Sequence, residues 1–216
     1  MSDESISNFN VPAFVFAGEV YTRIGIVSNG YAVVGGGTGA DVDFINQILP
    51  DPARPNNVLA PFWTDLDPGR GGALRVGILS SGPNRWLILD WQNVREWSST
   101  RTASFQIWIG LNGVEDISYT YGPRTSNGDG GFLTVGVENV FGNQGQSYYA
   151  DGVGILPMTG DQLRVTSVPG TPGETRTIGF QARGFQFGPY TMYANLTSSL
   201  IDGTTTTSFS GEVLRR

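Results

Sequence analysis

The chain has 216 residues, with 31 Gly, 12 Pro, a net charge of −6 and no Lys, His or Cys. These absences exclude a Ser-His-Asp triad, a cysteine nucleophile, a Schiff-base lysine, a lysine-dependent phosphate loop and zinc sites built from His or Cys. The scarcity of positive charge argues against nucleic acid as a partner, and no apolar run approaches the ~18 residues of an inserted membrane span.

The composition predicts an all-β fold. Gly occurs at about twice its usual frequency of ~7%, and the many Gly and Pro leave few stretches able to hold a long helix. We therefore expect an antiparallel β-sandwich with at most one short helix, near residues 41–49. In that segment Val42, Ile45 and Ile48 follow helical spacing before Pro50 ends the run.

The first predicted element is a β-hairpin over residues 21–35. Two runs rich in β-branched residues flank Asn29-Gly30, a strong two-residue turn signal. After the predicted short helix, residues 56–67 form an apolar run that ends in acidic residues. Strands are then predicted at 73–79, 85–91, 104–111 and 115–121.

The last two of these strands permit a register argument. Alternation places Ile107 and Ile109 on one face and Ile117 and Tyr119 on the corresponding face of the next strand. A single buried face requires Ile109 to lie opposite Ile117, which needs an odd number of loop residues. We therefore predict a three- or five-residue loop here, or a bulge, instead of a two-residue turn at Asn112-Gly113.

Further strands are predicted at 133–139, 162–166, 177–184 and 190–196. A stretch rich in Pro and Gly near residues 167–174 divides the chain into a sandwich over residues 17–166 and a C-terminal part over 167–216. The predicted core consists of residues that alternate along these strands. It contains Val58, Leu59, Phe62, Trp63, Leu87, Leu89, Phe105, Ile107, Ile109, Ile117, Tyr119, Val135 and Val137.

One segment carries a family resemblance. The residues Ala60-Pro61-Phe62-Trp63-Thr64-Asp65 resemble the core motif of the nidogen-like extracellular domain, an Ala-Pro-aromatic-Trp-x-Asp strand. Segments 28–31, 85–91, 105–108, 115–121 and 135–139 fit the same pattern. The sequence is also similar to the C-terminal accessory regions of secreted bacterial subtilisin-like proteases, in which such a module is combined with immunoglobulin-like strands. By this resemblance, residues 167–216 are immunoglobulin-like strands, which residues 1–16 could complete.

The resemblance implies an extracellular or cell-surface protein without catalytic residues. The start Met1-Ser2-Asp3-Glu4 is acidic and no apolar stretch follows it, unlike a signal peptide. The chain is therefore expected either to stay inside the cell or to be a piece of a larger secreted protein. Its expected partners are an extracellular protein or a polysaccharide.

Three functions compete at this point. The leading hypothesis is a non-catalytic extracellular module that serves adhesion, tethering or stabilisation in a larger secreted or surface protein. The second is a carbohydrate-binding module. The third is a self-assembling surface or filament subunit, a homo-oligomer in which a terminal strand such as residues 8–15 pairs with the open edge of a neighbour.

Two tryptophans are candidate ligand contacts. Trp108 alternates out of phase with the apolar face of its strand, and Trp97 follows a strand in a polar loop. Aromatic side chains are enriched at binding sites, but most of them pack in cores or across strands. Trp63 lies in an apolar run and is expected in the core.

Asp65 and Asp67 are the candidate metal ligands. Two carboxylates followed by a Gly-rich turn suit a hard cation such as Ca²⁺, and Asp41, Asp43 or Asp129 could add ligands. An ion pair between Asp65 and Arg70, or an Asx turn at Asp67, explains the same residues without a cation.

Carboxylate pairs are the one remaining route to acid/base catalysis. The close pairs in sequence are Asp65 with Asp67 and Glu115 with Asp116. Neither pair has the surroundings that a general acid requires, so we expect no catalytic residues and no enzyme.

Overall fold

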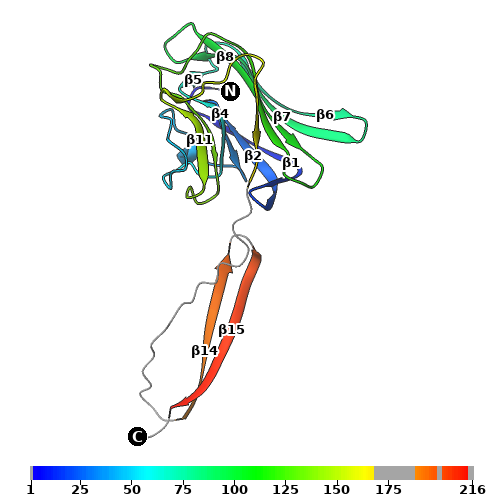
Figure 1. Ribbon diagram of the computed structural model, residues 1–216, viewed down its shortest axis with the longest axis vertical. Coiled ribbons are helices and arrows are strands. Elements are labelled where there is room, and N and C mark those ends of the chain that lie inside the picture. Colours follow the sequence, from blue (N-terminus) through cyan, green and yellow to red (C-terminus); the bar gives the residue numbers. More distant parts are fainter. Residues whose placement is uncertain (1, 168–187, 199–200, 214–216) are drawn as a thin grey trace. The chain divides into compact units, whose positions relative to one another are not determined.

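The computed structural model describes residues 2–167, 188–198 and 201–213, which fall into two units, Met1–Val168 and Pro169–Arg216 (Figure 1). The strands of the first unit are β1 (Ile6–Phe16), β2 (Glu19–Val27), β3 (Ala32–Val34), β4 (Val58–Trp63), β5 (Leu66–Asp67), β6 (Ala73–Ser81), β7 (Asn84–Glu96), β8 (Thr102–Gly110), β9 (Ile117–Arg124), β10 (Thr134–Glu138), β11 (Gly145–Ala150), β12 (Val153–Gly154) and β13 (Gln162–Val165).

Two antiparallel sheets form the first unit. The seven-stranded sheet has the order β1-β2-β3-β4-β10-β11-β12, and the six-stranded sheet has the order β13-β9-β8-β7-β5, with β6 also paired to β7. The chain crosses between the sheets at Thr64 and Asp65, between β4 and β5. The protein is therefore an all-β sandwich, as the composition predicts.

The core between the sheets follows from the two-residue period of the strands. In β7 and β8 the buried residues alternate with half-buried ones, which gives one apolar face to the core. Aromatic residues of the six-stranded sheet also donate hydrogen bonds to backbone carbonyls of the other sheet. Trp91 Nε1 bonds Val27 O, Tyr119 Oη bonds Gly136 O and Tyr121 Oη bonds Pro61 O, at 2.9–3.0 Å. These bonds fix the two sheets relative to each other.

The predicted core is confirmed at every position but one. Of the residues predicted to be buried, all are buried except Val137, which is half-buried and packs against the same cluster. The stacked pair Phe62 and Phe105, with ring centroids 5.2 Å apart, joins β4 to β8 across the core.

The predicted hairpin and the predicted register are confirmed, but the hairpin connection is longer than the two-residue turn predicted at Asn29-Gly30. β2 pairs with β3, and the connection around Asn29-Gly30 has three residues, 28–30, closed by a hydrogen bond from Val27 N to Tyr31 O. Ile109 lies opposite Ile117. The bond from Gly110 N to Asp116 O closes a five-residue loop, one of the two predicted lengths.

The predicted helix near residues 41–49 is wrong. A three-residue 3₁₀ helix (η1, Gly39–Asp41) precedes the segment, and residues 42–49 are irregular. Side chains take up the backbone groups that a helix would use. Tyr31 Oη accepts from Asp43 N, the Asp43 side chain accepts from Ile45 N, and Ser147 Oγ accepts from Leu49 N.

The segment instead forms a strap, residues 35–57, that connects β3 to β4 and covers a second core. This core lies on the side of the seven-stranded sheet away from the sandwich interior and contains Val27, Tyr31, Val33, Leu49, Val58, Ala60 and Trp63. Trp63 Nε1 donates to Asp43 O in the strap at 3.0 Å. All six residues of β4 are buried, because this sheet is covered on both faces.

β1 pairs with β2 and is the edge strand of the seven-stranded sheet. Phe14 and Phe16 from β1 are buried in the main core. Residues 2–16 therefore belong to the first unit.

The second unit contains a hairpin of β14 (Gly188–Ser198) and β15 (Ile201–Val213). The predicted strand at 190–196 lies within β14, and the predicted strand at 177–184 lies outside the described residues. In the described part of the chain, no helix is long and apolar enough to cross a membrane.

Candidate functional site

The six-stranded sheet turns one face away from the core, and we call this its outer face. The residues on it lie in rows that run across the strands, because paired residues in adjacent strands share a face. One row begins at Trp86 on β7, a second at Ile88 and a third at Asp90. The rows are Trp86, Gly110 and Asp116; Ile88, Trp108, Ser118 and Arg164; and Asp90, Gln106, Thr120 and Gln162.

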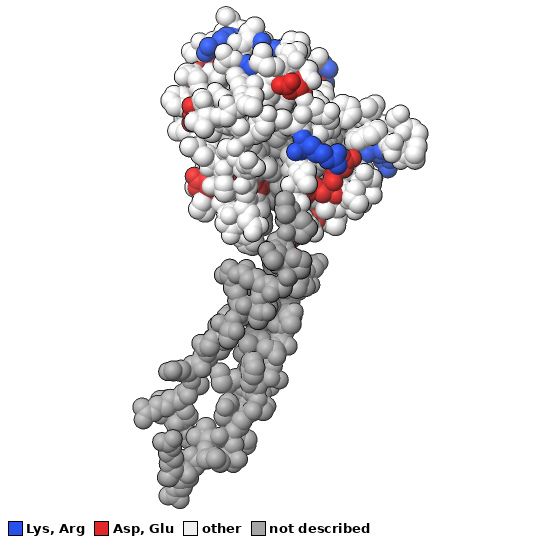
Figure 2. Space-filling view, in the orientation of Figure 1, with Lys and Arg blue, Asp and Glu red and all other residues white. Residues whose placement is uncertain are grey.

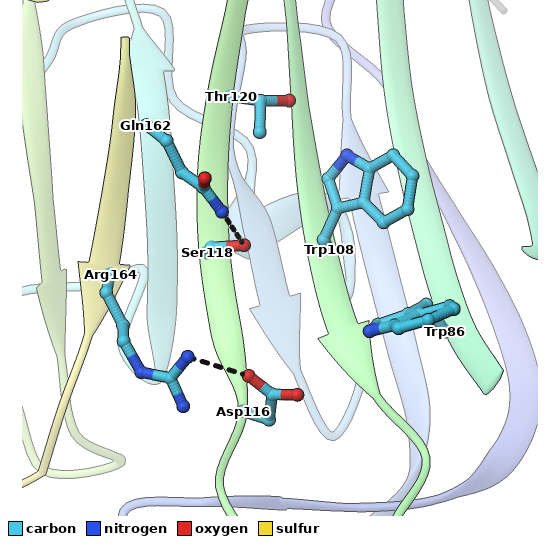
Figure 3. Close-up of a pocket in the computed structure, with 7 residues that line it drawn as sticks. All are labelled: Trp86, Trp108, Asp116, Ser118, Thr120, Gln162 and Arg164. Carbon is cyan, nitrogen blue, oxygen red and sulfur yellow. Dashed lines mark hydrogen bonds and ion pairs between the residues drawn. The ribbon is translucent and has the colours of Figure 1, made fainter. Parts of the chain in front are cut away.

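A pocket of about 330 Å³, which we call the hollow, lies on these rows. Figure 3 shows its two tryptophans on β7 and β8 and its polar residues on and beside β9 and β13. Its lining combines two aromatic rings with a carboxylate, two hydroxyls, an amide and a guanidinium. The lining residues are Trp86, Trp108, Asp116, Ser118, Thr120, Gln162 and Arg164.

Trp108 is held in place by a chain of hydrogen bonds. Its indole Nε1 donates to Gln106 Oε1 at 2.8 Å, and Gln106 Nε2 donates to Asp90 Oδ1 at 3.0 Å. Trp86 lies edge-on to Trp108, with ring centroids 6.3 Å apart and an interplanar angle of 69°. The hollow therefore contains two indole rings at an angle to each other, and hydrogen bonds orient one of them in the absence of a ligand.

Trp86 is a lining residue that the sequence reasoning missed. The signal was present, because Leu87, Leu89 and Trp91 alternate onto the core face and so place Trp86 on the opposite face. Alternation within β8 identifies Trp108 in the same way. Matching the two strands in register would have brought both tryptophans to one surface.

The side chain of Asp116 lies directly against the backbone of Gly110. A Cβ at this position would lie 2.6 Å from Asp116 Oδ2 and 2.8 Å from Asp116 Cβ. A side chain here would therefore displace Asp116. Gly110 therefore provides the room that the Asp116 side chain occupies.

Trp97 lies elsewhere, so the structure does not bring the two candidate tryptophans together. Trp97 follows the end of β7, whereas Trp108 lies opposite Ile88 toward the start of that strand. The Trp97 ring is 38% exposed, and the guanidinium carbon of Arg70 lies 5.0 Å from its centroid. This cation–π contact accounts for its position without a ligand.

The two candidate metal ligands have different surroundings. Asp67 is buried, its Oδ1 accepts from Gly69 N at 2.9 Å, and its Oδ2 pairs with Arg70 Nε at 3.1 Å. The Asx turn predicted at Asp67 is therefore present, and Arg70 pairs with Asp67 and not with Asp65. Both oxygens of Asp67 are already engaged.

Asp65 instead joins an acidic cluster with Asp3 and Glu4, whose carboxylate oxygens lie within 4.8 Å of one another. Burial, together with the charges of Glu4 and Asp3, raises the pKa of Asp65 to about 7. Asp65 Oδ1 and Asp3 Oδ1 are buried without a hydrogen-bond partner in the described part of the chain. These three carboxylates, rather than Asp65 with Asp67, are the arrangement that could hold a hard cation.

We expect millimolar Ca²⁺ to raise the melting temperature and a chelator to lower it. Binding to the folded state alone adds about 2.7 kcal/mol at a concentration 100 times the Kd. Asp65→Asn should abolish this response. Asp67→Asn should lower the melting temperature, because Arg70 loses its partner, but should keep the response to Ca²⁺. Superimposable wild-type melting curves in Ca²⁺ and in chelator would rule the cation out.

The second carboxylate pair does not form an acid/base pair. Glu115 accepts hydrogen bonds from Ala17 N and from Ser167, whereas Asp116 pairs with Arg164 Nη1 at 3.1 Å. The two neighbouring carboxylates therefore serve different contacts.

Glu138 is a buried carboxyl group whose position the sequence did not reveal. It is 1% exposed, its Oε2 accepts from Asp51 N at 2.9 Å, and its Oε1 has no partner among the described residues. Burial raises the pKa of Glu138 from 4.5 to about 7. The folded protein therefore holds this proton at a pH at which the unfolded chain has released it.

The stability of the protein should consequently fall as the pH rises from about 4.5 to about 7, and the contribution of Glu138 should stay constant above that range. The expected size of this contribution is on the order of 1–3 kcal/mol. Urea unfolding of wild type and Glu138→Gln at pH 5, 6, 7 and 8 measures it. As the pH rises from 5 to 7, the wild type should lose free energy of unfolding relative to Glu138→Gln. Parallel pH profiles would contradict the prediction.

Figure 2 shows small groups of both signs scattered among uncharged residues on the face in view.

Comparison with known families and structures gives one match. A family model described as NIDO related matches residues 1–182, which include all of the described first unit. No curated protein and no solved structure matches the chain.

Proposed function

Because the chain belongs to the NIDO-related family, we propose that it is a non-catalytic extracellular module that binds a ligand for a larger secreted or surface protein. Domains of this family are generally extracellular. The absence of Lys, His and Cys supports a non-catalytic role, because it removes His as a general base and Cys and Lys as nucleophiles.

The observation that carries the proposal is the difference between the two outer sheet surfaces. The strap seals one of them over a second apolar core. The outer face of the six-stranded sheet has no such cover in the described part of the chain, and it exposes the hollow with its two tryptophans. Aromatic residues surrounded by hydrogen-bonding groups in a concave surface are typical of binding sites.

Two measurements test this proposal. The first is protease treatment of intact cells that express the full reading frame with an epitope tag inside the module. Loss of the tag without cell lysis is expected for an extracellular module, and full protection would contradict the extracellular setting.

The second measurement is a solid-phase assay of the purified protein on immobilised extracellular proteins and on immobilised polysaccharides. We expect saturable binding to one of these surfaces. A variant with Ser118→Arg, which places a long charged side chain on the outer face, should lose it. Binding that survives this substitution would place the binding surface elsewhere.

A second candidate function is self-assembly through strand edges. β6 is an edge strand of nine residues, and its Ile78 and Leu79 are 47% and 45% exposed. An open edge with apolar side chains can pair with a neighbouring chain. Sedimentation of wild type and of a Leu79→Lys variant tests this. A monomeric wild type at high micromolar concentration would exclude it, and a wild-type oligomer dispersed by the variant would support it.

A further inference from the structure

We propose that the hollow binds a neutral pyranose unit of a glycan, with Trp86 and Trp108 as the stacking residues. The inference rests on the proposed binding function and specifies its ligand. The site is built from residues of four strands, β7, β8, β9 and β13, with Asp116 just before β9.

The two tryptophans provide the apolar part of the site. A pyranose ring has faces made of C–H groups and a rim made of hydroxyl groups, so it needs a flat apolar surface beside hydrogen-bonding groups. The indole rings of Trp86 and Trp108 are half-buried and lie at 69° to each other. One ring can therefore stack under the face of a sugar while the other contacts its edge.

Polar groups on the neighbouring strands provide the hydrogen-bonding part. In Figure 3, Ser118 and Thr120 lie on β9 next to the strand of Trp108, and Gln162 and Arg164 lie beyond them on β13. They offer both donors and acceptors, which matches sugar hydroxyls because each hydroxyl can donate and accept. The indole N–H of Trp86 donates to no residue in the described part of the chain, so it is a further free donor.

Charge in the hollow favours a neutral ligand. Asp116 pairs with Arg164 at 3.1 Å, and Asp90 accepts from Gln106 at 3.0 Å. The opposite charges of Asp116 and Arg164 offset each other, so the lining carries no net charge. The chain as a whole carries a net charge of −6, which also disfavours an acidic polysaccharide.

The size and rigidity of the hollow agree with this ligand. Its volume of about 330 Å³ lies at the lower end of the range of about 300–1,000 Å³ for small-ligand sites. The bonds from Trp108 to Gln106 and from Gln106 to Asp90 orient the Trp108 ring in advance. Little side-chain freedom is then lost on binding, which favours affinity.

Affinity gel electrophoresis tests the inference. Native gels containing a neutral glucan, mannan, galactan or xylan are compared with sugar-free gels, and gels containing alginate serve as the charged comparison. We expect at least one neutral polysaccharide to retard the wild type. Trp86→Ala and Trp108→Ala should each weaken retardation at least about tenfold, as the loss of a central aromatic contact does. Trp97→Ala, which removes an exposed tryptophan outside the hollow, should be retarded like the wild type.

A further variant separates ligand contact from folding. Ser118→Gln places a longer neutral side chain in the hollow beside Trp108 and keeps both tryptophans. As a surface substitution, it should leave the melting temperature close to that of the wild type. Loss of retardation in this variant supports the site even if a tryptophan variant fails to fold, and unchanged retardation overturns it.

The result also distinguishes this inference from the proposed function. If no neutral polysaccharide retards the wild type, or if alginate alone does, the inference of a neutral glycan is wrong. The proposed binding function is then decided by the solid-phase assay with immobilised extracellular proteins. If the wild type is retarded and Trp97→Ala loses as much affinity as Trp108→Ala, the hollow is not the site.

Discussion

Trp63→Ala is expected to lower the free energy of unfolding of the first unit by about 3–5 kcal/mol. The Trp63 side chain is fully buried, its ring lies 4.3 Å from that of Tyr31, and its Nε1 donates to Asp43 O. The substitution therefore leaves a large cavity beneath the strap and removes a bond that holds the strap in place. The loss is a large part of the ~5–15 kcal/mol that stabilises a domain of this kind.

Urea unfolding followed by tryptophan fluorescence measures this change, because all five tryptophans lie in the first unit. The melting temperature should fall by roughly 6–20 °C. Trp97→Ala is the matched control, since Trp97 is partly exposed and contacts Arg70 at the surface. A Trp63→Ala protein that melts within a few degrees of the wild type would show that the strap does not depend on this side chain.

Gly30→Ala is expected to destabilise the protein by about 2–6 kcal/mol, the sum of backbone strain and overpacking. Gly30 has φ of +80°, and a Cβ there would lie 2.0 Å from the carbonyl oxygen of Phe62. The carbonyl oxygen of Gly30 also accepts a hydrogen bond from Phe62 N. The clash is with backbone, so no side-chain rotation relieves it.

Gly18→Ala provides the comparison for this prediction. Gly18 has nearly the same φ, +81°, but no atom lies within 4 Å of its Cβ position. Gly18→Ala should therefore lower the free energy of unfolding only by the strain of the left-handed backbone, about 1–2 kcal/mol. Equal losses of stability in the two variants would show that the contact with Phe62 is not what makes Gly30 necessary.

The sequence predicted those features of the fold that follow from a two-residue period. Alternation along β8 and β9 was sufficient to place Ile109 opposite Ile117, because only one register buries both apolar sets. The predicted helix near residues 41–49 is wrong because its conformation does not depend on local spacing. Its spacing fitted a helix by chance, whereas its conformation is set by Tyr31, Trp63 and Ser147, which are distant in sequence.

The candidate site could be predicted only in part. Trp108 was identified from its phase within one strand, but the hollow also needs Trp86, Asp116 and Arg164, which other segments supply. The acidic cluster shows the same limit. Asp65 was singled out with its neighbour Asp67, yet its closest carboxylates, Asp3 and Glu4, come from the start of the chain. Proximity between segments far apart in sequence leaves no local pattern to detect.

The alternation in β7 and β8 also bears on how such a domain can diverge. Leu87, Leu89 and Phe105 face the core, while Trp86, Ile88 and Trp108 lie between them on the opposite side of the same strands. Selection for a stable sandwich therefore acts on the core-facing positions, and selection for a ligand acts on the outer-face positions that alternate with them. Members of one family can exchange the second set freely while they retain the first. Common ancestry would then preserve the architecture and leave each member to acquire its own ligand.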